Sequence, residues 1–138
     1  MTQISTTSTT KDADATTDLS SPEAATLIAT QNDAFRKSIA QFATGPDVPK
    51  GKVVMTRGVA EQSADFQREL ITKVIGFDAF DTDSDPYGWH EMGVIEIGDQ
   101  TVWFKIDLLD VNYAYGAEDP TNPDQTRRVM TLLFPSEY

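Results

Sequence analysis

The segment EMGVIEIGDQTVWFKIDLLD, residues 91–110, decides the fold, because it has the pattern of two β-strands joined by a tight turn. Gly98-Asp99-Gln100 separates the strands and is a typical hairpin turn sequence. Alternate residues of the second strand fall on opposite faces: Val102, Phe104, Ile106 and Leu108 on one, Trp103, Lys105 and Asp107 on the other. The sheet therefore has a core face and a more open face, and the open face is a candidate location for function.

Two helices are predicted before this hairpin. The first begins at Ser20-Ser21-Pro22-Glu23, where Ser20 and Glu23 have the spacing of a capping box, and it ends at Thr44-Gly45-Pro46. The second is capped by Ser63 and ends at Gly76. Each helix has one apolar face at helical spacing: Ile28, Phe35, Ile39 and Phe42 in the first, Phe66, Leu70, Val74 and Phe77 in the second.

Two further strands complete the predicted sheet. Gly51 to Val59 is a short apolar segment that begins at a glycine, and Thr126 to Phe134 is apolar on both faces, as in a central strand. The expected fold is α+β, with two helices packed on one face of a small, mainly antiparallel four-stranded sheet in the order α, β, α, β, β, β.

Length and composition limit the organisation of the chain. Its 138 residues are enough for one domain, which we expect over residues 21–138. Residues 1–20 are rich in Thr and Ser and nearly lack large aliphatic side chains, so we expect a disordered tail there. No segment has the pattern of a signal peptide or a membrane helix, and the expected location is the cytoplasm.

The formal net charge of −11 disfavours direct binding to nucleic acid or to anionic membranes. The charge is unevenly distributed: residues 76–125 contain twelve acidic residues and one basic residue, whereas residues 21–60 contain three acidic and five basic ones. The absence of cysteine excludes disulfides, thiolate zinc sites and a cysteine nucleophile, and a single histidine excludes sites that need two imidazoles.

An Asp-rich turn raises the question of metal binding. Asp81-x-Asp83-x-Asp85 resembles the opening of a calcium loop, but Pro86 replaces the glycine at the sixth position and Met92 the carboxylate at the twelfth. The favoured interpretation is an acidic turn in which Asp85 caps its own backbone. The alternative is a divalent metal site, in a binding protein or a small enzyme, formed by four residues: Asp83, Asp85, His90 and Glu91.

His90 is the only side chain that ordinarily titrates near neutrality, and we expect Asp107 or Asp110 near it across the hairpin. The sequence has no nucleophile elbow, phosphate-binding glycine loop or paired-carboxylate motif, so enzymatic activity is disfavoured and no cofactor is expected. A structural histidine that hydrogen-bonds the adjoining turn is the favoured interpretation. In the first helix, Asn32, Asp33 and Arg36 are interpreted as solvated polar residues, with Arg36 able to reach an acidic group on the sheet.

The acidic region of residues 76–125 contains the aromatic residues Tyr87, Trp89 and Trp103, and aromatic side chains among charges are typical of protein interfaces. We therefore predict a non-enzymatic module that binds a protein partner with a basic surface. The predicted contact residues are Asp83, Asp85, Tyr87, Trp89, His90, Glu91, Trp103 and Asp107. In a sharper version, the protein is an accessory protein of a plasmid or phage, and its carboxylates mimic the charge of DNA and block a nucleic-acid-binding partner.

Several short motifs together resemble the domain of unknown function family 3768. They are Asn32-Asp33-x-Phe35-Arg36, Thr56-x-Gly58, Asp85-Pro86-Tyr87-Gly88-x-His90, Lys105-Ile106-Asp107, Asp119-Pro120, Pro123, Thr126-x-Arg128-Val129 and Glu137-Tyr138. The resemblance covers roughly residues 27 to 138, and the chain differs from it at Trp89 and at Glu91-Met92. It implies a proteobacterial, often plasmid-borne protein, and it transfers no catalytic role.

Overall fold

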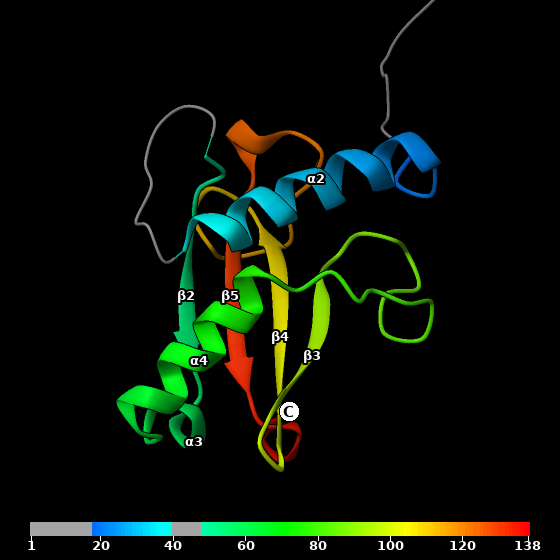
Figure 1. Cartoon of the computed structure of the whole chain (residues 1–138). Coiled ribbons are helices and arrows are strands. Elements are labelled where there is room, and N and C mark those ends of the chain that lie inside the picture. Colours follow the sequence, from blue (N-terminus) through cyan, green and yellow to red (C-terminus); the bar gives the residue numbers. More distant parts are fainter. Residues whose placement is uncertain (1–17, 40–47) are drawn as a thin grey trace, which may run out of the picture.

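A computed structural model describes residues 18–39 and 48–138 (Figure 1). Most of the predicted tail, and the predicted helix end with Phe42 and Thr44-Gly45-Pro46, lie outside these residues. The described elements are α2 (Pro22–Ser38), β2 (Gly51–Met55), α3 (Arg57–Ala60), α4 (Ala64–Ile75), β3 (Met92–Ile97), β4 (Gln100–Leu109), the 3₁₀ turn Pro123–Gln125, β5 (Arg127–Leu133) and the 3₁₀ turn Pro135–Glu137. Within the described ranges, every helix is too short or too polar to cross a membrane.

The four strands form one mixed sheet in the order β2-β5-β4-β3. β5 pairs antiparallel with β4 and parallel with β2, and β4 forms the predicted antiparallel hairpin with β3. The α+β class is therefore confirmed, and the segment predicted to be central is an inner strand. Two of the three strand pairings are antiparallel, and one short helix, α3, is added to the predicted order.

The core lies between the sheet and the two longer helices, which cover the same face (Figure 1). Phe104 and Ile106 of β4 are buried there, as the alternation in the hairpin predicts. They belong to one apolar cluster with Phe35 of α2 and with Leu70 and Val74 of α4. Burial of such side chains contributes about 1.5–3 kcal/mol each, so this layer accounts for the docking of both helices.

The N-cap of the first helix lies one residue later than predicted. Ser21, not Ser20, is the N-cap, and its hydroxyl accepts a hydrogen bond from the Ala24 N–H at 3.1 Å. Pro22 explains the shift, because proline favours the first helical position and places the cap on the residue before it. The second helix begins as predicted, with the Ser63 hydroxyl accepting from the Phe66 N–H.

The predicted strand Gly51 to Val59 is wrong in its second half. β2 ends at Met55, and Arg57–Ala60 forms α3. The carboxylate of Glu137, close to the end of the chain, accepts hydrogen bonds from the Thr56 hydroxyl and the Gly58 N–H. A long-range contact therefore stabilises the start of this short helix, which a local apolar pattern cannot indicate.

Candidate functional site

Residues 78–91, called the acidic loop below, connect α4 to β3 and contain five carboxylates and no lysine or arginine. Asp81 organises its first half, because its carboxylate accepts hydrogen bonds from the N–H groups of Asp83 and Ser84. The hydrogen bonds from Ser84 lower the pKa of Asp81 below its ordinary value. Asp81 therefore stays charged, and its side chain is exposed together with that of Asp83.

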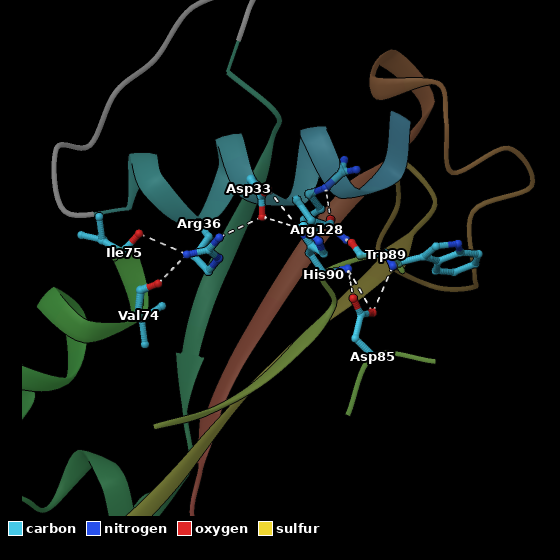
Figure 2. A network of polar contacts seen from close by, with 9 residues as sticks. Asp33, Arg36, Val74, Ile75, Asp85, Trp89, His90 and Arg128 are labelled. Carbon is cyan, nitrogen blue, oxygen red and sulfur yellow. Dashed lines mark hydrogen bonds and ion pairs between the residues drawn. The ribbon is translucent and has the colours of Figure 1, made fainter. Parts of the chain in front are cut away.

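Asp85 organises the second half of the acidic loop. It is buried, and its carboxylate accepts hydrogen bonds from the N–H groups of Trp89 at 3.0 Å and His90 at 3.1 Å (Figure 2). This arrangement confirms the prediction that Asp85 caps its own backbone. Because both amides are bound to the Asp85 carboxylate, the turn between residues 85 and 90 is fixed from within.

His90 joins the acidic loop to α2. Its Nδ1 lies 3.0 Å from Oδ2 of Asp33, and its ring stacks on Phe80 with centroids 4.0 Å apart. The carboxylate that contacts the His90 ring is that of Asp33, from the distant first helix, and not that of Asp107 or Asp110. His90 also has φ = +57°, a left-handed conformation that non-glycine residues seldom adopt. The surrounding contacts must stabilise this conformation.

Asn32 of α2 is buried and holds the acidic loop through a hydrogen bond to its backbone. The Asn32 amide nitrogen donates to the Trp89 carbonyl at 3.0 Å, and its oxygen accepts from Nε of Arg128 at 2.7 Å. Arg128 also donates to Gln31 and is fully buried, and burial lowers the pKa of Arg128 to about 10. The loop, α2 and β5 are therefore connected through a single asparagine.

Arg36 extends this network to the end of α4. Its guanidinium donates to the carbonyls of Val74 and Ile75 and to Oδ1 of Asp33, and it lies over the ring of Phe80. A cation at this place adds a donor to carbonyls in the last turn of the helix and complements the helix dipole. The interpretation of Asn32 and Arg36 as solvated is wrong, because Asn32 is fully buried and Arg36 is 1% exposed. The acidic group that Arg36 reaches is Asp33 of its own helix and not a residue of the sheet.

Sequence reasoning did not identify Arg128 or the network as a unit. One signal was available in the sequence. Arg128 alternates with its neighbours so that it shares a face of β5 with Met130 and Leu132, which predicts a positive charge on the core face. A buried cation requires polar partners. Asn32, Asp33 and Arg36 lie within two turns of one helix, but their partners outside that helix are 38 to 96 residues away in sequence.

The exposed part of the acidic loop presents an aromatic pair. Tyr87 is 67% exposed, and its ring centroid lies 5.5 Å from that of the partly exposed Trp89. Asp83 is exposed on the same loop. Tyr87, Trp89 and Asp83 are therefore available to a partner, whereas Asp85 and His90 are engaged in internal contacts.

Two predicted contact residues lie elsewhere, on the open face of the sheet. Trp103 packs against Tyr138, and Asp107 forms an ion pair with Lys105 at 2.8 Å. Glu91, the last residue of the acidic loop, is partly buried, and burial, together with the charges of Asp85 and Asp107, raises its pKa above the ordinary value. The structure thus brings Asp107 near the acidic loop through Glu91 but places Trp103 against the C-terminal residue.

The four residues of the alternative metal site have separate roles in the structure. Asp85 binds backbone amides, His90 faces Asp33, Asp83 is exposed and Glu91 lies toward Asp107. In residues 18–39 and 48–138, no three His, Asp or Glu side chains are grouped so that they could hold a metal ion.

Of the comparisons with known proteins, the family comparison supports the resemblance over residues 55–137, which leaves out the motif at residues 32–36. No curated protein and no solved structure matches the chain. One family model, described as "Protein of unknown function (DUF3768)", matches residues 55–137, which include α3, α4, the acidic loop and all of β3, β4 and β5. The match extends over more than half of the 138 residues, and the chain belongs to this family.

Proposed function

We propose that the protein is a non-enzymatic binding module whose acidic loop engages a protein partner with a basic surface. The exposed Tyr87 and its neighbour Trp89 are suited to bury apolar area at an interface. Asp83 and the other carboxylates around them would attract Lys and Arg side chains and increase the association rate. The proposal places this interaction in the cytoplasm, which is consistent with the absence of cysteine.

The observation that carries the proposal is the fixed conformation of the acidic loop. Its backbone is bound from inside by Asp85 and from α2 by Asn32, and His90 is held between Asp33 and Phe80. A loop that is ordered before binding loses little conformational entropy when a partner docks. The buried Arg36 and Arg128 take part in the contacts that order the acidic loop. The loop itself has no lysine or arginine, so its exposed surface is suited to a basic partner.

The sharper version of the proposal is mimicry of DNA charge. In it, the carboxylates of the loop occupy the groove in which a DNA-binding partner accepts phosphates. Twelve acidic residues within residues 76–125, against Lys105 alone, support this version. It predicts that duplex DNA displaces the protein from its partner, and that rising salt weakens the complex because attraction between exposed charges is screened beyond about 10 Å at 0.1 M.

Affinity capture from bacterial lysate, quantified by mass spectrometry, tests the proposal. Wild type is compared with Tyr87→Ala and Asp83→Asn in the acidic loop, and with the controls Tyr115→Ala and Glu23→Gln, whose side chains are exposed outside that loop. We expect a basic protein whose capture falls about tenfold or more in the loop variants and is unchanged in the controls. Equal capture by all five baits would contradict the proposal.

A further inference from the structure

The outer edge of β3 is an unpaired side of the sheet. β3 pairs only with β4, and it lies at one end of the strand order, next to the acidic loop (Figure 1). The Ile106 N–H donates to the Glu91 carbonyl at 2.7 Å, so the backbone groups of Glu91 point toward β4. Every second residue after Glu91 in β3 has the same orientation. By the alternation of an antiparallel ladder, the backbone groups of Met92, Val94 and Glu96 point away from the sheet.

One hydrogen bond confirms that the backbone of Glu96 points away from the sheet, and it also reduces the number of unpaired groups along this edge. The Glu96 carbonyl accepts a hydrogen bond from Nζ of Lys73 in α4 at 2.8 Å, so this group does face outward and is partly satisfied. In the described part of the chain, no backbone hydrogen bond outside the strand ladders involves Met92 or Val94. The available edge is therefore centred on Val94.

The edge is accompanied by two neighbouring hollows of about 280 and 340 Å³. Phe77, Ala79 and Val94 line both of them. Phe77 packs edge-on against Phe104 and so comes from the helix-covered face, whereas Val94 belongs to the open face and is 40% exposed. A chain placed along the edge would have apolar surface on both sides.

The charges around the hollows select the occupant. Asp78, Asp81, Asp83 and Glu96 contribute four carboxylates, and Lys73 is the one basic residue in the lining. Lys73 is already 3.1 Å from the carboxylate of Glu69 and bonded to the Glu96 carbonyl. The two hollows along the β3 edge are therefore complementary in charge to a basic segment.

We propose that the outer edge of β3 binds an extended segment of the partner as a fifth strand, with Lys or Arg side chains alternating with apolar ones. Because successive side chains of a strand point to opposite faces, one set would lie beside Val94 and the other toward the acidic loop. This inference rests on the proposed function, since it states how the basic partner of the acidic loop is held.

A binding assay with a defined probe tests the inference. The probe is a short fluorescent peptide in which lysine and valine alternate, and its control is the same peptide N-methylated at alternate residues, which keeps the charge but cannot form a ladder. The variants are Val94→Lys, which adds repulsion, and Val94→Pro, which removes an outward N–H and no ladder bond. Val54→Lys is the matched control, because Val54 is a 38% exposed valine of the other edge strand, β2.

We expect wild type and Val54→Lys to bind the alternating peptide equally, and both Val94 variants and the methylated peptide to give about tenfold or more weaker binding. Thermal melts of each variant serve as the control that it is folded. Equal binding of both peptides, equal binding by Val94→Lys, or no binding to wild type would overturn the inference. Binding that is lost in Tyr87→Ala but kept in both Val94 variants would overturn it and leave the acidic loop as the binding surface.

Discussion

Arg36 connects two helices and the acidic loop through one guanidinium. Replacing it by methionine removes the guanidinium donor from the carbonyls of Val74 and Ile75 and from the carboxylate of Asp33. The Val74 carbonyl keeps the Phe77 N–H, and Asp33 keeps its contact with His90. We predict that Arg36→Met lowers the free energy of unfolding by about 2–3 kcal/mol, measured by urea denaturation. Arg68→Met is the control, because the ion pair of Arg68 with Asp65 is exposed and contributes little. An equal loss in both variants would contradict the role given to Arg36.

Gly93 allows the ring of Phe104 to pack against β3. A Cβ atom at Gly93 would lie 2.3 Å from that ring and 2.8 Å from the ring of Phe77. We predict that Gly93→Ala destabilises the fold by about 1–3 kcal/mol through overpacking. At Gly116 an added Cβ meets no atom within 4 Å, so Gly116→Ala should leave the urea midpoint unchanged. A neutral Gly93→Ala would show that the core at this point is looser than described.

Glu91 should reduce stability at neutral pH. Burial and the charges of Asp85 and Asp107 raise its pKa in the folded state, so the folded protein holds the proton more tightly than the unfolded chain. Stability is therefore lost as the pH rises from the unfolded-state pKa of about 4.3 through the raised value. We predict that Glu91→Gln raises the urea midpoint at pH 7 and has little effect at pH 4, where wild type is largely protonated. The exposed Glu118→Gln is the control, and an unchanged midpoint in Glu91→Gln at pH 7 would refute the prediction.

At the scale of elements, the features predicted correctly are those with local causes. The Ser63 cap and the apolar period of α4 lie within the helix itself, and the β3–β4 hairpin follows from one turn and one alternation. The parallel pairing of β2 with β5 was not predicted, because it joins Gly51 to Arg128 across most of the chain. α3 was missed for the same reason, since Glu137 supplies its contacts from the other end of the sequence.

The link between Glu137 and α3 gives a test by pH. Hydrogen bonds from the Thr56 hydroxyl, first, and from the Phe134 and Gly58 N–H groups lower the pKa of Glu137. Its contribution is therefore present above the unfolded-state pKa of about 4.3 and is lost as the pH falls through the folded-state value. We predict that Glu137→Gln lowers the urea midpoint at pH 7 and that the difference from wild type shrinks in acid. A difference that is constant with pH would show that the carboxylate charge does not matter.

For the whole molecule, the sequence predicts where the acidic residues are concentrated, but it does not predict which of them make internal contacts. Counting residues locates the acidic region and the aromatic pair Tyr87 and Trp89. It does not show that Asp85 and His90 are engaged internally, or that Asn32 of α2 holds the Trp89 carbonyl. These contacts join segments that only the folded chain brings together, and they determine which predicted contact residues remain available to a partner.

Hydrogen–deuterium exchange of the protein alone and in its captured complex tests most directly whether the acidic loop is an ordered binding surface. The Trp89 and His90 amides are bound to Asp85, so we predict that they exchange slowly in the free protein. On binding, further slowing should be concentrated in residues 78–91 and at the edge of β3. Rapid exchange of the Trp89 and His90 amides before binding, or a footprint that spares residues 78–91, would contradict the account.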